Sequence, residues 1–340
     1  MAAPLSAMSA AYRKIDEKLR NNDVVILDGG IGSELQEVGF PDSADARPAN
    51  FTWGSIAIDE APDKLVEVHR RYAATGADVL ETHTFFLNRI WSATQDGRLD
   101  LGPDDWKDLA LKSVRLVREG ARLAGRDDVC VAFACRTQDW PADQQHIAKG
   151  YDGWYVQLDL ENYLKPLADL LANADPESKP DCILMEIQQW IPEDLEFPDY
   201  QVFIDTGIPV WIAYRRTIGK VVGVEGETLI EDGDRFGQAA RKFEEMGAAA
   251  VLVNCLPSPQ INGITPWLRQ YTSLPIGAYP NMGTYLHYEW NWTNCETPDE
   301  LLGYAQGWAD EGMQIIGGCC GARPAHIQKL ADELKAPVTA

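Results

Sequence analysis

Two adjacent cysteines near the end of the chain are hard to explain by packing alone. They lie in the stretch MQIIGGCCGARPAHI, residues 313 to 327. Successive residues on a strand point to opposite faces, so only one of Cys319 and Cys320 could be buried with its neighbours. Three interpretations are open: a strained vicinal disulfide, an incidental pair, or two ligands of one metal ion.

A third thiol extends the metal interpretation. Cys255 ends the apolar run VLVNC, residues 251 to 255. Three thiolates that converge on one point form a soft site that suits Zn2+ and leaves a fourth position open, as catalytic zinc requires. Both adjacent cysteines can face one ion only if the chain turns sharply, and the glycines at 317, 318 and 321 give the backbone that freedom. Spacing alone leaves open whether these cysteines are ligands or unrelated residues.

The cysteine count argues against a disulfide framework. The chain has seven cysteines in 340 residues. In a large chain with reduced thiols, clustered cysteines more often bind metal or do chemistry, which weakens the vicinal-disulfide interpretation. We expect Cys130, Cys135 and Cys182 to be core residues and Cys295 to be a loop thiol.

The charge of the chain argues against two classes of partner. Its 52 acidic and 30 basic residues give a net charge of -22, and the acids are spread along the sequence. Nucleic acids and anionic membranes bind clustered Lys and Arg, so neither is an expected partner. No apolar run reaches the roughly 18 residues of a membrane span, and the N-terminus lacks the apolar stretch of a signal peptide. We therefore expect a cytoplasmic protein.

Short apolar runs recur along the chain, each followed by turn residues and then by a stretch with helical spacing. Such alternation predicts a parallel sheet with crossover helices, and eight units predict an α/β fold closed into a (β/α)8 TIM barrel. A doubly wound open sheet is the alternative. The expected strands are VVILDGG (24–30), ADVLETHTFF (77–86), VCVAFACR (129–136), CILMEIQQW (182–190), PVWIAYRR (209–216), AAVLVNCLP (249–257), PIGAYPN (275–281) and MQIIGGCCG (313–321).

The helices and the length of the chain predict one domain. A barrel typically has about 250 residues or more, and the sequence contains no linker or low-complexity tract. We expect a single barrel over residues 23–335. Residues 1–22 would form an N-terminal helical extension whose apolar face plugs the lower end of the barrel. The expected helices are 62–76, 106–125, 234–247 and 298–312, and the apolar face of the extension comprises Met8, Tyr12, Ile15 and Leu19.

The active site of a barrel gathers at the carboxyl ends of its strands. Those ends bring together residues that are far apart in the sequence. They supply Asp28, Gly29 and Gly30; Thr84, Phe85 and Phe86; Glu186; Asn254 and Cys255; Pro280 and Asn281; and Cys319 with Cys320.

Five stretches of the chain resemble the homocysteine S-methyltransferase family, whose zinc-dependent barrels include betaine-homocysteine and S-methylmethionine-homocysteine methyltransferases. The resemblance runs in the right order from about residue 24 to 331. GGCCG paired with an upstream NC is a specific signature, and it favours the zinc interpretation of the thiols. The stretches are ILDGGIGSEL, LVEVHRRYAATGADVLETHTF, LVNC, YPNMG and GWADEGMQIIGGCCGARPAHI.

The resemblance implies a metal site and an acceptor. Cys255, Cys319 and Cys320 would hold Zn2+, and the thiol of homocysteine would take the fourth position. A free thiol has a pKa of about 8.5, and zinc coordination deprotonates it to the thiolate that methyl transfer needs. We therefore expect no catalytic residue beyond the metal site.

The resemblance also implies how the amino-acid end of the acceptor is bound. Glu186 matches the family glutamate expected to accept the ammonium group; a solvated surface residue is the alternative. The turn at residues 28–30 leads into a helix that starts near Ser33, and exposed amides there could hold a carboxylate. An ordinary strand-to-helix turn is the alternative. The substrate-binding candidates are Asp28, Gly29, Gly30, Glu186 and Asn254.

The expected methyl donor carries a positive charge, which aromatic faces stabilise. Trp53 stands sixteen residues before His69, where the betaine enzymes place a tryptophan that contacts the donor. Phe85 and Phe86 match neighbouring aromatic residues of the donor site. We expect most of the other tryptophans that follow strand ends to be packing residues, with one or two completing the cage. These are Trp140, Trp190, Trp290 and Trp292.

The sequence departs from the family around the small-molecule site. Phe86 replaces a tyrosine that can reach the metal in the betaine enzymes, so the resting fourth ligand is open. ETHTF brings in His83, which we interpret as a packed histidine rather than a catalytic one. EIQQW lacks the usual continuation after strand four, and Met282 replaces a common serine.

Three hypotheses about function follow. The first is methyl transfer to homocysteine, giving methionine, from S-methylmethionine, S-adenosylmethionine, dimethylsulfoniopropionate or betaine. The second is the same chemistry with another thiol or selenol acceptor, or demethylation of a sulfonium metabolite. The third is a non-catalytic zinc-binding or small-molecule-binding barrel. For each we expect a monomer or small homo-oligomer.

Overall fold

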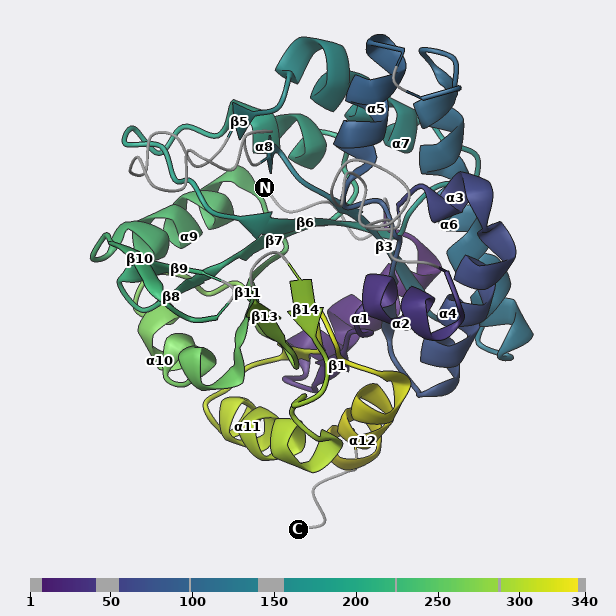
Figure 1. The fold of residues 1–340 in the computed structure, drawn as a ribbon. Coiled ribbons are helices and arrows are strands. Elements are labelled where there is room, and N and C mark those ends of the chain that lie inside the picture. The colour runs from purple at the N-terminus through teal and green to yellow at the C-terminus, as the bar shows by residue number, and fades with distance from the viewer. Residues whose placement is uncertain are drawn as a thin grey trace.

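The computed structural model describes residues 8–40, 55–97, 99–139, 156–223, 225–286 and 289–335. Parallel strands form a barrel at the centre of the molecule (Figure 1). The barrel has eight strands in the order β1-β15-β12-β11-β7-β6-β3-β2. A parallel bridge between Leu27 and Val79 joins the first and last strands of this order and closes the barrel. The (β/α)8 prediction is confirmed, and the open-sheet alternative is wrong.

Every expected strand is present, although each is shorter than the apolar run that predicted it. Six of the runs continue past the carboxyl end of their strand, where the chain leaves the sheet toward the site, whereas the runs 249–257 and 275–281 end with β11 and β12. The barrel strands are β1 (Val25–Ile26), β2 (Val79–Glu81), β3 (Cys130–Cys135), β6 (Cys182–Gln188), β7 (Val210–Tyr214), β11 (Ala250–Pro257), β12 (Ile276–Asn281) and β15 (Ile315–Ile316).

Helices surround the strands, as Figure 1 shows. The four helices expected after strands are all present as α4, α6, α9 and α11. None of the described helices has both the length and the apolar character that crossing a bilayer needs. The helices are α1 (Ala10–Arg20), α2 (Ile31–Glu37), α3 (Ala57–Glu60), α4 (Pro62–Ala74), α5 (Leu87–Gln95), α6 (Asp105–Leu123), α7 (Lys165–Ala172), α8 (Pro198–Ile204), α9 (Arg235–Met246), α10 (Ile264–Leu268), α11 (Pro298–Asp310) and α12 (Pro324–Leu334).

Local sequence signals set the ends of these helices. α11 begins with a capping box, in which Thr297 accepts from the amide of Glu300 and the Glu300 side chain accepts from the amide of Thr297. α9 ends at Gly247, whose φ of 101° is the left-handed conformation that favours glycine.

Three small antiparallel sheets follow the carboxyl ends of barrel strands. Their strands are two to four residues long, too short for the alternation that would reveal them in sequence. The sheets are β4 (Gln138–Asp139) with β5 (Val156–Gln157); β8 (Arg216–Thr217), β9 (Lys220–Val222) and β10 (Thr228–Glu231); and β13 (Thr284–Leu286) with β14 (Glu289–Asn291).

The N-terminal helix α1 closes the amino end of the barrel, opposite the carboxyl ends of the strands. Tyr12, Ile15 and Leu19 of α1 are buried, and they pack in one apolar cluster with inward-facing residues of the strands. The Trp211 indole inside this cluster donates to the Tyr12 hydroxyl at 2.9 Å. The helix therefore fills the amino end of the barrel, as its apolar face predicts. The domain boundary at residue 22 stays a prediction.

Candidate metal and substrate site

Three thiols meet at the carboxyl end of the barrel. The sulfur atoms of Cys255, Cys319 and Cys320 all lie within 4.8 Å of one another. Cys319 Sγ and Cys320 Sγ are 3.9 Å apart, and all seven cysteines of the chain are free. The vicinal disulfide is therefore not formed, and the structure brings together the three residues that sequence spacing could only suggest.

Irregular backbone turns all three thiols toward one point. Cys255 has a φ of 56°, in the left-handed region that non-glycine residues seldom occupy. It lies where the register of β11 against β12 shifts between Asn254 and Pro257. After β15, Gly321 has a φ of 81°, and a Cβ on Gly318 would lie 2.2 Å from the Ala322 Cβ. Conformational strain of this kind is commonly stored at functional sites.

Backbone hydrogen bonds hold the cysteine loop, residues 317–322, between its neighbouring strands. The Gly318 amide donates to the carbonyl oxygen of Asp28 at 3.1 Å, and the Cys319 amide donates to that of Pro280 at 2.7 Å. On the far side, the Met282 amide donates to the Cys320 carbonyl oxygen at 2.8 Å. The loop is thus fastened to the ends of both strands that flank β15.

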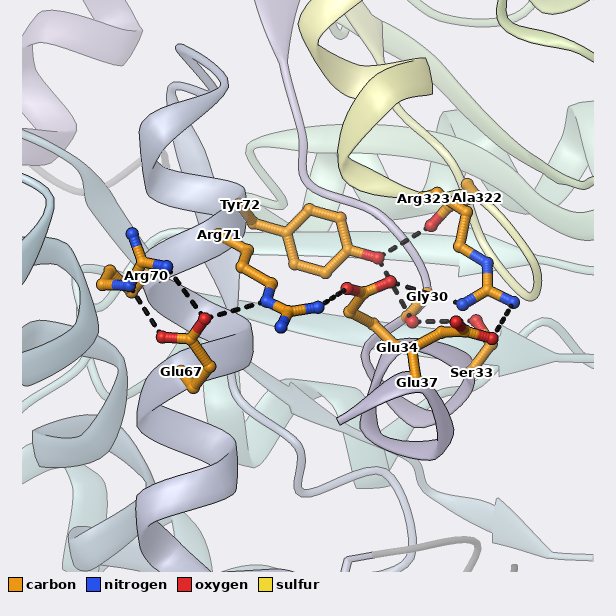
Figure 2. Close-up of polar contacts among 10 residues, drawn as sticks. All are labelled: Gly30, Ser33, Glu34, Glu37, Glu67, Arg70, Arg71, Tyr72, Ala322 and Arg323. Atoms are coloured by element: carbon orange, nitrogen blue, oxygen red, sulfur yellow. Dashed lines mark hydrogen bonds and ion pairs between the residues drawn. The ribbon is translucent and has the colours of Figure 1, made fainter. Parts of the chain in front are cut away.

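A second set of contacts supports the loop from α2 and α4 (Figure 2). The Tyr72 hydroxyl donates to the carbonyl oxygen of Ala322 at 2.7 Å. Glu34 is only 3% exposed and binds two guanidinium groups, that of Arg71 at 2.8 Å and that of Arg323 at 3.5 Å. The Ser33 hydroxyl accepts from the Gly321 amide at 3.0 Å. The turn after β1 and the cysteine loop therefore form one connected unit.

Three carboxyl groups lie inside the barrel mouth beside the thiols. Asp28, Glu81 and Glu186 are 0%, 8% and 7% exposed. Asp28 Oδ2 accepts from the backbone amide of Glu81 at 3.0 Å, while Asp28 Oδ1 has no hydrogen-bond partner among the described residues. The surface alternative for Glu186 is thus excluded, and Asp28 offers an acceptor that a ligand could use.

Burial shifts the ionisation of this carboxyl cluster. Desolvation raises the pKa of Asp28 and Glu81 well above its usual range, and the negative charge of Glu186 acts in the same direction. Burial also raises the pKa of Glu186 to about 7, against the opposing effect of the neighbouring Tyr279 and Glu81 side chains. A cationic group bound among these carboxyls would favour their ionised forms.

The three thiols also affect one another's ionisation. Hydrogen bonds from Cys319 and Cys320 lower the pKa of the Cys255 thiol well below its usual range, and the positive charge of Arg215 acts in the same direction. The interaction with Cys255 raises the pKa of the other two thiols. The three thiols are therefore close enough for the ionisation of one to affect the other two.

The expected carboxylate-binding turn is more constrained than its sequence indicates. α2 begins at Ile31, two residues earlier than expected, and Gly30 precedes it as the N-cap. The Gly30 amide already donates to the carbonyl oxygen of Ala322 at 3.0 Å. A Cβ on Gly29 would lie 2.5 Å from the same oxygen. Both glycines therefore permit the close approach of the cysteine loop. The Gly30 amide is occupied by this contact, so only the Gly29 amide could bind a substrate.

Asn254 joins the thiol site to the carboxyl cluster. Its side chain is fully buried, and its Oδ1 accepts from the backbone amide of Ile187 at 3.2 Å. Its Nδ2 has no hydrogen-bond partner among the described residues. Asn254 therefore fixes the end of β6 next to Glu186 and retains one donor for a ligand.

The structure describes only some of the aromatic residues expected at the donor site. Phe85 and Phe86 pack edge to face, with ring centroids 4.6 Å apart. Trp53 and Trp140 lie outside the described residues, as does the side chain of Trp290. The Trp292 indole donates to Gln36 Oε1 at 3.1 Å, and its ring lies against Gly321 of the cysteine loop. The division of the tryptophans into packing and donor-site residues stays a prediction.

The family model described as homocysteine S-methyltransferase matches residues 25–334. The chain belongs to the homocysteine S-methyltransferase family. It is therefore a methyltransferase, and the resemblance read from its sequence is confirmed.

Individual relatives support this assignment over nearly the whole chain. Homocysteine S-methyltransferase 4 of Zea mays is 27% identical over 327 residues, covering 90% of this chain and 88% of the maize protein. Selenocysteine methyltransferase of Astragalus bisulcatus is 25% identical over 332 residues, covering 90% of each. The crystal structure of the homocysteine methyltransferase MmuM from Escherichia coli, metallated form, matches with a TM-score of 0.66 at 21% identity. It covers 95% of this chain and 99% of the bacterial one, which confirms the fold.

Sequence reasoning missed four residues of this methyltransferase site. Glu81, Arg136, Arg215 and Tyr279 are all buried at the barrel mouth. Glu81 and the two arginines lie in the runs that predicted strands β2, β3 and β7. For the three charged residues, the available signal was a charge at the carboxyl end of an apolar strand, which is ambiguous because such a residue is more often solvated.

Proposed function

We propose that this family member transfers a methyl group from a sulfonium or betaine-type donor to the zinc-bound thiolate of homocysteine, giving methionine. The observation that carries the proposal is the convergence of three cysteine sulfurs within 4.8 Å at the barrel mouth. Beside them lie buried carboxyl groups suited to the ammonium group of an amino acid.

The geometry of the thiols fits a zinc ion. In a tetrahedral site with Zn–S bonds of about 2.3 Å, two sulfur ligands are roughly 3.8 Å apart. The Cys319 and Cys320 sulfurs are 3.9 Å apart. Cys255, Cys319 and Cys320 would hold the ion, which would supply the Lewis acidity that keeps a thiol in its fourth position as a thiolate. Phe86 has no oxygen to offer that position, so an acceptor thiol does not have to displace Phe86 there.

The carboxyl cluster would bind the ammonium group of the acceptor. Asp28, Glu81 and Glu186 repel one another when ionised in a buried site, and an ammonium group removes that repulsion. The Gly29 amide and the Asn254 side-chain amide offer donors for the carboxylate at the other end. This arrangement directs the thiol of a bound homocysteine toward the three cysteines.

The methyl transfer itself needs positioning rather than a general base. The acceptor sulfur attacks the methyl carbon in line, and a new S–CH3 bond forms as the bond to the donor sulfur or nitrogen breaks. The electron pair of that bond stays on the donor, which leaves as a neutral thioether or tertiary amine. Phe85 would exclude water from the path of the methyl group, and Trp53 stays the second aromatic residue expected in the donor site.

The test is methionine formation from homocysteine by the zinc-loaded protein. The donors to supply are S-methylmethionine, S-adenosylmethionine, dimethylsulfoniopropionate and betaine, each with mass-spectrometric detection of methionine. Turnover with at least one donor is the expected result. Absence of methionine with all four would overturn the proposed reaction.

A selenol or another thiol is the second candidate acceptor. The relative from Astragalus bisulcatus is named a selenocysteine methyltransferase, and it covers 90% of this chain. Selenocysteine is one methylene shorter than homocysteine but carries the same ammonium and carboxylate groups. Comparing kcat/KM for homocysteine, cysteine and selenocysteine with one donor decides between these acceptors.

Two further expectations belong to this proposal. A cytoplasmic location fits it, because the three thiols must stay reduced to bind a metal. The monomer or small homo-oligomer remains the expected assembly. The third hypothesis, a non-catalytic barrel, is not supported, because the chain belongs to a family of methyltransferases.

A further inference from the structure

The barrel mouth contains buried arginine side chains as well as thiols and carboxyls. Arg136 follows β3 and is 3% exposed, and Arg215 follows β7 and is 6% exposed. Both strands flank β6, the strand that carries Glu186. Burying a guanidinium group is costly, so two of them at a substrate site require an electrostatic reason.

Arg215 lies beside the thiol site. Tyr214 is in register with Val253, so Arg215 follows at the level of Asn254, next to Cys255. The backbone amide of Arg215 donates to the carbonyl oxygen of Gln188 at 3.0 Å. With its amide oxygen turned toward this guanidinium group, Gln189 accepts from Nε at 2.8 Å. The side chain is therefore held with its charge close to the sulfur atoms.

Arg136 lies on the opposite side of β6. Cys135 is in register with Met185, so Arg136 follows at the level of Glu186. Its Nη1 is 3.1 Å from Asp139 Oδ1, and its guanidinium carbon lies 4.6 Å from the centroid of the Phe85 ring. Burial lowers the pKa of Arg136 to about 10, and the positive charges of Arg89 and Arg215 contribute to this decrease. Arg136 nonetheless remains charged at neutral pH.

The aromatic pair expected to face a cationic donor already faces guanidinium groups. Arg136 lies over Phe85, and the guanidinium carbon of Arg89 lies 4.1 Å from the centroid of the Phe86 ring. Arg89 also binds both oxygens of Asp139 at 2.9 Å. A donor with only a positive charge would be repelled here, whereas a donor that brings its own anion would be attracted.

We propose that Arg136 and Arg215 form an anion subsite that binds the carboxylate of the methyl donor, so that the donor is a sulfonium or quaternary ammonium carboxylate with no net charge. The guanidinium fork matches the geometry of a carboxylate. This inference rests on the proposed methyl transfer and goes beyond it by assigning recognition of the donor to these two residues.

The subsite has a consequence for the reaction. As the methyl group leaves, the donor sulfur or nitrogen takes the electron pair and loses its positive charge, while the carboxylate stays ionised. A neutral zwitterion thus becomes a thioether or amine carboxylate, and the thioether product carries a net negative charge. Nearby guanidinium groups favour this loss of positive charge at sulfur. They also bind the anionic thioether product, which we expect to be a competitive inhibitor against the donor.

The experiment compares two donors that differ only in the carboxylate. The zinc-loaded protein is given homocysteine and either 3-(dimethylsulfonio)propionate or 3-(dimethylsulfonio)propanamide. We expect kcat/KM to be about 10- to 100-fold higher for the carboxylate, the range for a charge-assisted pair. Arg136→Met should bring this ratio close to one, and Arg136→Lys should restore part of it. Zinc content is measured for each variant.

The matched control is Arg118→Met. Arg118 Nη1 is 3.4 Å from Asp181 Oδ2, so it forms an arginine–carboxylate pair like Arg136, but Asp181 precedes β6 at the amino end of the barrel. The preference for the carboxylate donor should stay unchanged in this variant. A second measurement needs no variant: calorimetry should show tighter binding of 3-(methylthio)propionate than of its amide to the wild-type protein.

The outcomes separate this inference from the proposed function. Equal methyl transfer from both donors, or equal binding of both thioethers, would overturn the anion subsite and leave methyl transfer standing. If Arg136→Met instead abolished discrimination between homocysteine and its carboxamide, the arginines would bind the acceptor, and the donor assignment would be wrong. No transfer from any donor would overturn the proposed function itself.

Discussion

The Tyr72 hydroxyl donates to the carbonyl oxygen of Ala322 at 2.7 Å, across 250 positions of sequence (Figure 2). Tyr72 lies on α4 and is fully buried, and Ala322 ends the loop that carries Cys319 and Cys320. The Gly30 amide donates to the same oxygen at 3.0 Å. A helix on the outside of the barrel is thus joined directly to the proposed metal loop and to the turn after β1.

Tyr72→Phe should loosen this loop without unfolding the protein. The Ala322 oxygen keeps the Gly30 amide, so we expect a loss of only about 1 kcal/mol in the free energy of unfolding. Zinc affinity should fall as well, by about 10- to 100-fold, as for other changes to groups that position metal ligands. Chemical denaturation and competition with a chelator measure the two quantities.

Tyr200→Phe is the control for this prediction. Tyr200 is also fully buried, and its hydroxyl lies 2.7 Å from that of Tyr214, away from the cysteine loop. It should show a similar loss of stability with unchanged zinc affinity. If both variants retained wild-type zinc affinity, the Tyr72 bond would be a packing feature only.

Cys319→Ser should separate the metal ligands from the other thiols. Zinc prefers thiolate to hydroxyl, so the variant should lose bound zinc, and methionine formation should fall by more than about 100-fold. Cys295→Ser is the matched change at a half-buried cysteine whose thiol donates to the Trp292 carbonyl oxygen at 3.2 Å. It should retain both zinc and activity. Metal analysis of the purified variants and a methionine assay check the result, and full activity in Cys319→Ser would overturn the mechanism.

The sequence predicted the fold well because each barrel strand is one apolar run followed by turn residues. The spacing of the cysteines left their role open, and the resemblance of GGCCG and the upstream NC to a known family is what predicted the thiol site. The role of Gly29 was harder to foresee. Its short distance to Ala322 depends on where the last loop of the barrel returns, and no local pattern encodes such a long-range approach.

Arg136 and Arg215 show a second reason why sequence reasoning stops short. Both sit at the carboxyl ends of expected strands, where a charged residue is usually solvated. Arg136 pairs with Asp139, three residues further along, but Gln189, the partner of Arg215, lies on the segment after β6. Such a compensated charge is visible only when the partners have been placed in space.

Gly29→Ala should destabilise the protein through a clash rather than through lost flexibility. The new Cβ would lie 2.5 Å from the Ala322 carbonyl oxygen and 2.8 Å from Tyr72 Cε1. Neither the backbone nor a packed ring can move freely, so we expect a cost of about 1 to 3 kcal/mol. Gly303→Ala is the control, because a Cβ in that part of α11 meets no atom within 4 Å. It should stabilise the helix by about 0.5 to 1 kcal/mol. Thermal and urea unfolding measure both, and equal effects would contradict the clash.

His69 should make stability fall as the pH is lowered. It lies on α4 and is 1% exposed, and its Nδ1 has no hydrogen-bond partner among the described residues. Burial lowers the pKa of His69 to about 3, from 6.5 in an unperturbed histidine, and the positive charge of His83 acts in the same direction.

The unfolded chain therefore binds a proton at His69 below pH 6.5, while the folded chain resists it until about pH 3. The stabilisation is fully present above pH 6.5 and is lost as the pH falls toward 3, by about 2 kcal/mol at pH 5. His69→Gln cannot take up this proton. Between pH 7 and pH 5, the free energy of unfolding should thus decrease by about 2 kcal/mol more in the wild type than in the variant. Urea titrations at both values measure the difference, and parallel decreases would show that His69 is already protonated, or accessible to protons, in the folded chain.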